Sequence, residues 1–309
     1  MRRKNKGMKY IPYDYEAVFQ NELEKLHELF QEQLIKERHK AVYALKEITA
    51  GEQLEIEFYP EFSQVSAIPE EGRLKKDNTA AQKNLNDKNA QKYLERLINH
   101  NFREWDIWIT LTYADGQEPE TMEQALHNMQ NYIKRINYRR KKLGLPNARY
   151  VYITEYDPDA EIRWHHHLVM DGALDMDSVE KTWKKGRRNE VRSTDPDDYG
   201  LSGMSHYITK SKNRKKGEKR WNSSTNLKQF RERKTHSKRR KPSDRYEPIE
   251  KYVDRFVKDQ DEIERQLAIW YPDYLFTQSK IYYNDFNGMF YIHARMRKPK
   301  KYRKAAHDG

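Results

Sequence analysis

Short strand patterns alternate with a helical pattern in the middle of the chain, and this order restricts the possible fold more than any other feature. Trp105–Tyr113, Arg149–Tyr156 and Trp164–Met170 place apolar side chains at every second position, as half-buried strands do. Residues 119–144 place them three or four positions apart, which is typical of a helix with one apolar face. We therefore expect an α+β fold with a central antiparallel sheet and helices packed on it.

Both flanks of this region have weaker patterns. The spacing predicts a long amphipathic helix over Tyr15–Lys46, a strand at Leu54–Phe58 and a second helix over about residues 80–99. We therefore expect residues 1–100 to form a mainly helical N-terminal region, followed by a domain over residues 101–242.

The C-terminal flank, residues 243–309, is expected to form a helix and a hairpin. Ile249–Trp270 has helical spacing and is followed by a proline. Asn287-Gly288 lies between two alternating segments, and this dipeptide is the strongest short-range hairpin signal.

The net charge is concentrated in one segment. The 309 residues contain 60 Lys and Arg against 48 Asp and Glu, a net charge of +12. Tyr207–Lys241 contains 15 Lys and Arg against Glu218 and Glu232, a net charge of +13, so the rest of the chain sums to −1. Such a segment is either a solvated basic run or a structured basic surface, and the interleaved Trp221 and Phe230 favour a surface for part of it. Its expected partner is a polyanion such as nucleic acid.

Composition also excludes several classes of protein. With no cysteine, the chain has no disulfide, thiolate zinc site or cysteine nucleophile. No apolar stretch approaches the roughly 20 residues of a membrane-spanning helix, and the basic segment Met1–Lys9 leads into no signal-peptide core. A cytoplasmic protein without a membrane partner is expected. There is also no phosphate-binding loop of the ATPase type.

A cluster of histidines follows the second strand pattern of the central region. On a strand, His165 and His167 lie on one face, and two neighbouring imidazoles form half of a divalent metal site. If the two strands form a hairpin centred on Ala160, Glu155 pairs with His165 and lies on that same face. A Glu, His, His metal site results. The alternatives are structural histidines and a solvent-facing Glu155.

Two further elements complete the pattern. Tyr207 and Lys210 are three residues apart, so on a helix the phenol and the ammonium would be neighbours. A nearby cation or metal favours attack by a tyrosine, which is otherwise a poor nucleophile. Ile109–Tyr113 ends the first strand, where it serves either as a core strand or in contact with substrate.

Taken in order, these elements resemble the HUH endonucleases, specifically the rolling-circle replication initiators (Rep proteins) of phages and plasmids. The resemblance covers about 120 residues, Trp108–Leu227. It implies an HUH domain with an antiparallel sheet of the RRM or ferredoxin-like kind. It also implies a DNA nickase of the bacterial cytoplasm, which cleaves single-stranded or extruded origin DNA and acts with a host helicase and polymerase.

The resemblance assigns a role to each matching residue. Tyr207 would be the nucleophile and Lys210 its partner, and Glu155, His165 and His167 would bind a divalent metal, Mg or Mn. The residues expected to contact DNA are Thr112, Tyr113, Arg214, Lys215, Lys216, Lys219 and Arg220. The expected product is a 5′-phosphotyrosyl DNA link with a free 3′-hydroxyl, from which the strands can be rejoined.

Two features limit this assignment. His166 stands where the family usually has a bulky hydrophobic residue, and a shifted register would make it a ligand. The positions four residues either side of Tyr207 are Gly203 and Ser211, so the two-tyrosine arrangement of some relatives is absent. A single-tyrosine HUH transposase, a relaxase and a basic DNA-binding protein without catalysis are the alternative functions.

Overall fold

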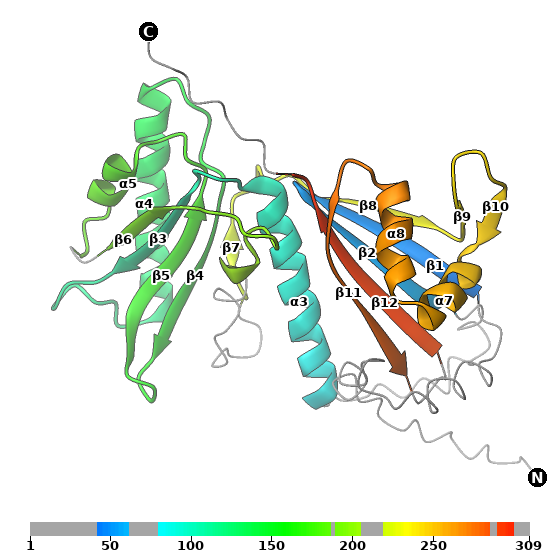
Figure 1. The fold of residues 1–309 in the computed structure, drawn as a ribbon. Helices are drawn as coiled ribbons and strands as arrows, with labels where there is room; N and C mark the ends of the chain where they lie inside the picture. The colour runs from blue at the N-terminus through cyan, green and yellow to red at the C-terminus, as the bar shows by residue number, and fades with distance from the viewer. Residues whose placement is uncertain (1–41, 62–79, 187–188, 205–218, 285–288, 300–309) are drawn as a thin grey trace, which may run out of the picture. The chain divides into compact units, whose positions relative to one another are not determined.

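A computed structural model of the chain describes residues 42–61, 80–186, 189–204, 219–284 and 289–299 (Figure 1). These residues form two compact units. The central unit consists of the described residues 50–52 and 91–230. The terminal unit consists of the described residues 42–49, 53–90 and 231–299.

The central unit contains a five-stranded antiparallel sheet of the order β6-β3-β5-β4-β7. Its strands are β3 (Ile107–Thr112), β4 (Tyr150–Asp157), β5 (Ile162–Met170), β6 (Glu190–Ser193) and β7 (Asn222–Ser223). The expected α+β class is confirmed, and the expected strands β3, β4 and β5 form the middle of the sheet. The edge strands β6 and β7 were not expected from the sequence.

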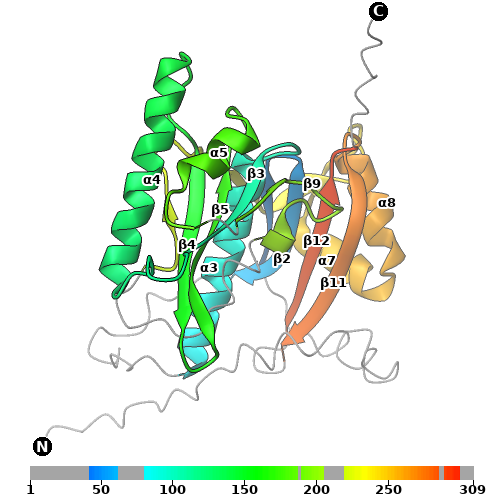
Figure 2. The same cartoon turned by 90° about the vertical axis from the view of Figure 1, so that its left-hand side faces the viewer.

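Both faces of the central sheet are covered. Figures 1 and 2 show α4 (Met122–Lys142) and α5 (Met176–Thr182) on one side of it. Apolar side chains from alternate strand positions, such as Ile109 and Leu168, pack with α4 there. The intervening positions, such as Trp108 and Val169, face the other way and pack against Leu94 and Ile98 of α3 (Ala80–Asn101). A sheet with two covered faces can present functional side chains only near its ends.

A buried ion pair ties α4 to the end of β5. The Arg140 Nη1 lies 2.8 Å from Asp171 Oδ1, with side-chain exposures of 2% and 8%. Arg140 Nε also donates to the Pro146 carbonyl at 2.6 Å, and Asp171 Oδ2 accepts from the Arg149 backbone N–H at 2.5 Å. Both charged groups are therefore compensated by hydrogen bonds as well as by each other.

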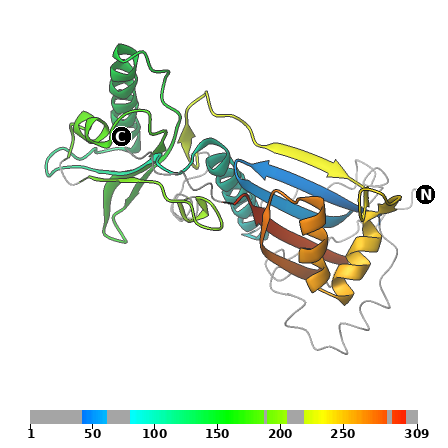
Figure 3. The same cartoon turned by 45° about the horizontal axis from the view of Figure 1, so that its top comes forward.

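The terminal unit contains a second five-stranded sheet, of the order β11-β12-β2-β1-β8. Figure 3 shows α7 and α8 on one face of this sheet. The strands are β1 (Val42–Ala50), β2 (Gln53–Glu61), β8 (Arg231–Thr235), β11 (Leu275–Asn284) and β12 (Met289–Arg297). The helices are α7 (Ile249–Lys258) and α8 (Asp261–Trp270), preceded by a small hairpin of β9 (Ser237–Arg239) and β10 (Tyr246–Pro248).

The core of the terminal unit joins segments from both ends of the described chain. Leu45 and Phe58 pack with Phe256 and Leu267 of the helices and with Phe290. The rings of Phe58 and Phe256 meet edge to face, with centroids 5.4 Å apart. Strand β2 accordingly pairs with β12, more than 230 positions later in the chain.

The structure corrects two expectations for the flanks. The helix expected over Tyr15–Lys46 is wrong for residues 42–46, which belong to strand β1, while residues 15–41 lie outside the described part. The separate regions 1–100 and 243–309 are not how the described chain divides, since segments of both share one sheet. Pairing of distant strands leaves no local pattern in a sequence.

Other expectations for the flanks are confirmed or refined. The strand expected at Leu54–Phe58 and the helix expected at residues 80–99 are present as β2 and α3. The single helix expected over Ile249–Trp270 is two helices, because Asp259 has an extended backbone (φ −140°) and accepts a hydrogen bond from the Asp261 N–H. The expected C-terminal hairpin is present as β11 and β12. None of the helices in the described ranges is long and apolar enough to cross a membrane.

We predict that Arg140→Leu lowers the free energy of unfolding of the central unit by about 3–5 kcal/mol, because Asp171 is left buried without its charge partner. The neighbouring Arg139 is exposed, so Arg139→Leu should change that free energy by less than about 0.5 kcal/mol. Urea denaturation of both variants measures the difference. Equal losses would contradict a stabilising role for the buried pair.

Candidate metal centre

The pairing of β4 with β5 brings Glu155, His165 and His167 together. Glu155 is opposite His165 and Ile153 is opposite His167, which is the expected register. The Glu155 Oε2 lies 3.1 Å from His165 Nε2 and 3.5 Å from His167 Nε2, and the two Nε2 atoms are 3.0 Å apart. All three side chains are largely buried, with exposures of 15%, 19% and 4%. They form one compact cluster at the end of the sheet.

Neighbouring groups orient the two imidazoles. The Nδ1 of His165 is 2.8 Å from the Arg163 carbonyl, which can only accept, so Nδ1 carries the proton and a neutral ring leaves a lone pair on Nε2. The Nδ1 of His167 is 3.2 Å from the Thr110 hydroxyl, and Trp108 stacks on the His167 ring at a centroid distance of 5.6 Å. Such outer partners fix ring orientation in metal sites.

The charges in the cluster complement each other. Burial alone would raise the pKa of the Glu155 carboxyl, but hydrogen bonds to His165 and His167 outweigh it and lower that pKa to about 2. Burial alone would lower the pKa of His165, but its hydrogen bonds to Glu155 and the Arg163 carbonyl raise it above its usual 6.5. The carboxylate is therefore ionised throughout the neutral range and attracts a positive charge, either a proton on an imidazole or a metal cation.

The three ligand atoms fit a divalent cation. Adjacent ligands on an octahedral ion with bonds of about 2.1 Å lie about 3 Å apart. The separations of 3.0, 3.1 and 3.5 Å in the cluster are close to this value. Two imidazole nitrogens and one carboxylate oxygen suit a first-row divalent ion, and three protein ligands leave positions for substrate oxygens.

His166 lies on the opposite face of β5 and is fully buried. Its Nε2 is 2.8 Å from the Tyr113 hydroxyl and its Nδ1 is 2.8 Å from the Thr154 hydroxyl. The edge of the ring meets Trp183 at a centroid distance of 5.6 Å. Burial lowers the pKa of His166 to about 3, so the ring is neutral. This residue is a polar member of the core and has no path to the cluster on the other face.

Strand β3 contributes to both faces. Thr110 and Thr112 pair with His167 and His165 and lie on the side of the cluster. Tyr113, which was expected at the DNA, points to the other face and is 6% exposed. Because side chains alternate along a strand, Thr112 and Tyr113 cannot both line the site. The burial of Tyr113 does not support a direct contact with DNA.

Part of the basic segment is folded onto the central unit. Trp221 stacks on Tyr93 of α3 at a centroid distance of 6.3 Å, and Phe230 meets the same ring edge to face at 5.4 Å. The Asn101 side chain forms two hydrogen bonds of 2.8 Å with the backbone of Lys228. The surface expected from the interleaved aromatic residues is therefore present over residues 219–230.

The expected residues of the basic segment are only partly described. Lys219 is exposed and Arg220 is half-buried, next to Trp221. The others lie outside the described residues, namely Tyr207, Lys210, Arg214, Lys215 and Lys216. Residues 201–204 precede them and are held to α3, where Leu201 N–H donates to Asn99 at 2.7 Å and the Ser202 hydroxyl donates to Glu95 at 2.5 Å.

Two residues of the site were not expected from the sequence. Trp108 and Thr110 lie beside His167, yet the sequence marked them only as parts of a strand. Alternation puts Trp108, Thr110 and Thr112 on one face of β3, so the signal was present. It could be used only once β3 was known to pair with β5.

A family model matches the part of the chain that contains this cluster. Residues 106–212, which are 107 of the 309 residues, match the family of the replication-associated protein ORF2. The matched segment contains Glu155, His165 and His167, as well as Tyr207 and Lys210. This likeness indicates a role in DNA replication, consistent with a replication initiator.

Comparison with individual proteins adds little. The crystal structure of the hypothetical protein ORF119 from Sulfolobus islandicus rod-shaped virus 1 aligns with 41% of this chain and 98% of that chain. The identity is 15% and the TM-score is 0.27, which is too low to support an argument on fold or function. No curated protein sequence matches the chain.

We predict that His166→Phe lowers the free energy of unfolding by about 2–4 kcal/mol, because the Tyr113 and Thr154 hydroxyls lose their partner in a buried site. Tyr113→Phe in the same chain should restore part of this loss. Thermal denaturation of the single and double variants measures the coupling between the two residues. Strictly additive losses would show that the hydrogen bond between them contributes nothing.

Proposed function

We propose that the protein is a rolling-circle replication initiator that nicks one specific strand at an origin. The observation that carries this proposal is the compact Glu155, His165, His167 cluster inside the segment that matches a replication-associated family. That segment also contains Tyr207, the proposed nucleophile. The central unit would thus hold the whole reaction.

The proposed reaction is a transesterification at phosphorus. The Tyr207 phenol oxygen attacks a phosphodiester, forming a Tyr–O–P bond while the bond from phosphorus to the 3′ oxygen breaks. The phenol proton is transferred to the departing 3′ oxygen. The products are a 5′-phosphotyrosyl link and a free 3′-hydroxyl, which can prime synthesis. Because the phosphodiester energy is kept in the tyrosyl ester, the reverse attack can rejoin strands without ATP.

Each member of the cluster has a defined task in this proposal. Glu155, His165 and His167 would hold Mg²⁺ or Mn²⁺, while the Arg163 carbonyl and Thr110 keep the imidazoles in place. When bound, such an ion acts as a Lewis acid that stabilises charge developing on the scissile phosphate. The burial of His167 and the stacking of Trp108 keep water away from one side of the ligands.

Basic side chains would hold the DNA strand. Lys210 would stabilise the Tyr207 phenolate or the charge on the phosphate. Thr112, at the cluster end of β3, would contact the strand near the scissile bond. The residues proposed to bind backbone phosphates are Arg214, Lys215, Lys216, Lys219 and Arg220.

We expect Tyr207→Phe to abolish covalent attachment to a single-stranded origin oligonucleotide, because phenylalanine has no oxygen to form the ester. Tyr138→Phe is the matched control, since Tyr138 lies exposed on α4 and takes no part in the site. Adducts are detected as slower bands on a denaturing gel. A Tyr207→Phe protein that still forms the adduct would refute the assignment of the nucleophile, and nicking without any adduct would refute the transesterification.

Removal of the metal should stop cleavage. We expect EDTA to abolish nicking and Mg²⁺ or Mn²⁺ to restore it, and His165→Ala or Glu155→Ala to bind Mn²⁺ at least about 10-fold more weakly by calorimetry. His127→Ala, a change at an exposed histidine of α4, should bind like the unchanged protein. Full affinity in the His165→Ala protein would refute the ligand set. A metal-binding protein that never cleaves would favour a DNA-binding function without catalysis.

A further inference from the structure

The last part of the basic segment lies in the terminal unit and has no task in the proposed nicking reaction. Arg231–Arg245 contains eight Lys and Arg against two acidic residues. It runs through the edge strand β8 and into the β9-β10 hairpin, which Figure 3 shows directly after β8. We propose that this hairpin binds the phosphate backbone of double-stranded DNA.

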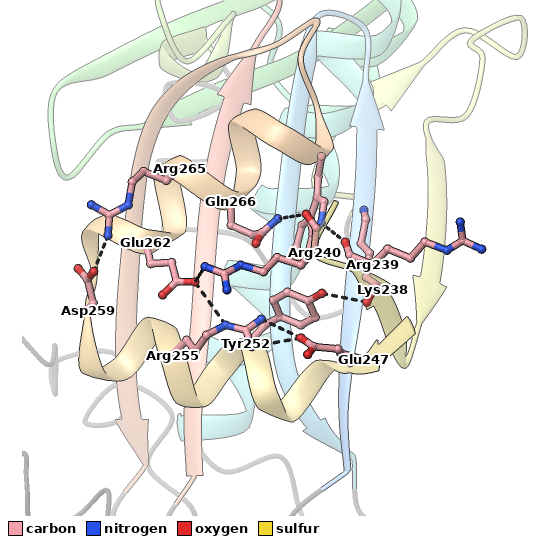
Figure 4. A network of polar contacts seen from close by, with 11 residues as sticks. Lys238, Arg239, Arg240, Glu247, Tyr252, Arg255, Asp259, Glu262, Arg265 and Gln266 are labelled. Atoms are coloured by element: carbon pink, nitrogen blue, oxygen red, sulfur yellow. Dashed lines mark hydrogen bonds and ion pairs between the residues drawn. The ribbon is translucent and has the colours of Figure 1, made fainter. Parts of the chain in front are cut away.

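The hairpin is held rigidly by the helices of its own unit. Three consecutive backbone carbonyls of β9 and the residue after it each accept a hydrogen bond from a helix side chain. Tyr252 donates to the Lys238 carbonyl at 2.9 Å, Trp270 donates to that of Arg239 at 2.6 Å, and Gln266 donates to that of Arg240 at 2.8 Å. Figure 4 shows the bonds from Tyr252 and Gln266. The backbone that carries the arginines is therefore fixed before any ligand binds.

Lys238 is directed inward and works as an anchor. Its ammonium is 2.5 Å from Glu47 Oε1 and 2.6 Å from the Tyr271 hydroxyl. It also lies over the rings of Trp270 and Tyr271, at 4.7 Å and 4.2 Å from their centroids. The inward position of Lys238 leaves the neighbouring Arg239 on the outer side of the ribbon.

The acidic residues near the hairpin are already neutralised within the terminal unit. Glu247 of β10 accepts two hydrogen bonds from Arg255, at 3.1 Å and 3.2 Å. Glu262 lies 3.3 Å from Arg255 and 3.4 Å from Arg240, as Figure 4 shows. These carboxylates therefore do little to offset the charge that the hairpin presents to solvent.

The outward side of the hairpin carries positive charge. Arg239, Lys241 and Arg245 are exposed. Arg239 lies over the ring of Tyr246, 4.7 Å from its centroid, and donates to the Pro242 carbonyl at 2.9 Å. The guanidinium is thus oriented by two contacts that leave its charge unpaired by any carboxylate among the described residues. Such a group is well placed to bind a phosphate.

The residue types favour a duplex over a single strand. Proteins that bind single strands stack bases on exposed aromatic rings, whereas the one aromatic ring of this hairpin, Tyr246, is covered on a face by Arg239. A two-stranded ribbon fits the major groove of B-form DNA. Contacts from Lys and Arg to phosphates position a protein on a duplex without reading its sequence. The proposal rests on the proposed function only in taking DNA as the partner.

Lys241→Ala combined with Arg245→Ala tests the proposal in the full-length protein. Binding is followed by fluorescence anisotropy with a labelled duplex of arbitrary sequence and with one of its single strands, in EDTA so that no cleavage occurs. We expect the double variant to bind the duplex about tenfold more weakly at about 0.1 M salt, with a salt dependence lower in slope by about 2. Its affinity for the single strand should change much less.

The matched control removes two exposed charges elsewhere in the same unit, by Lys258→Ala and Arg265→Ala. This control should bind the duplex like the unchanged protein. Equal affinity of both double variants for the duplex would overturn the proposal, and so would an equal loss on duplex and single strand. Adduct formation on an origin oligonucleotide, measured in the same preparations, tests the proposed function separately, since a protein that forms no adduct can still bind duplex through this hairpin.

Discussion

A shift of one residue between β4 and β5 would turn Glu155 away from His165, because successive side chains of a strand point to opposite faces. The register is therefore the constraint on which the candidate metal centre depends. It is supported at one end by the hydrogen bonds that Asp171 accepts from Arg140 and Arg149. Near the other end, past the cluster, the pairing becomes irregular between Glu155 and Asp157. The ligands thus occupy the last regular positions of the hairpin, where a carboxylate and two imidazoles can meet without being covered by the helices.

The same alternation explains how three consecutive histidines can serve two purposes. His165 and His167 face a carboxylate, which favours positive charge at the cluster. His166 faces a core that disfavours charge, and two hydroxyl groups satisfy both of its nitrogens. One strand therefore separates a polar, cation-binding environment from a neutral one by the thickness of a single sheet. A polar residue at this core position is tolerated because its hydrogen bonds are complete.

Local patterns predicted the central unit well. The hairpin of β4 and β5 joins neighbouring segments, so its register followed from the position of the loop, and the pairing of Glu155 with His165 is confirmed. The terminal unit could not be predicted in this way, because β2 pairs with β12 and β1 with β8 across most of the chain. The inward position of Tyr113 and the contact of Thr110 with His167 likewise depend on which strands are neighbours. Periodicity identifies a strand, but it does not identify the partner of that strand.

The terminal sheet has a consequence for the order of folding during synthesis. Strands β1 and β2 leave the ribosome early, yet β2 has no partner on one side until β12 has been made. The central unit, whose strands β3, β4 and β5 are close in sequence, can complete its core while the C-terminal part is still being translated. Nascent chains that end before β12 would carry an unpaired strand edge, which is a template for aggregation. A chain built in this way gains from rapid completion of translation or from a chaperone that covers β2 in the meantime.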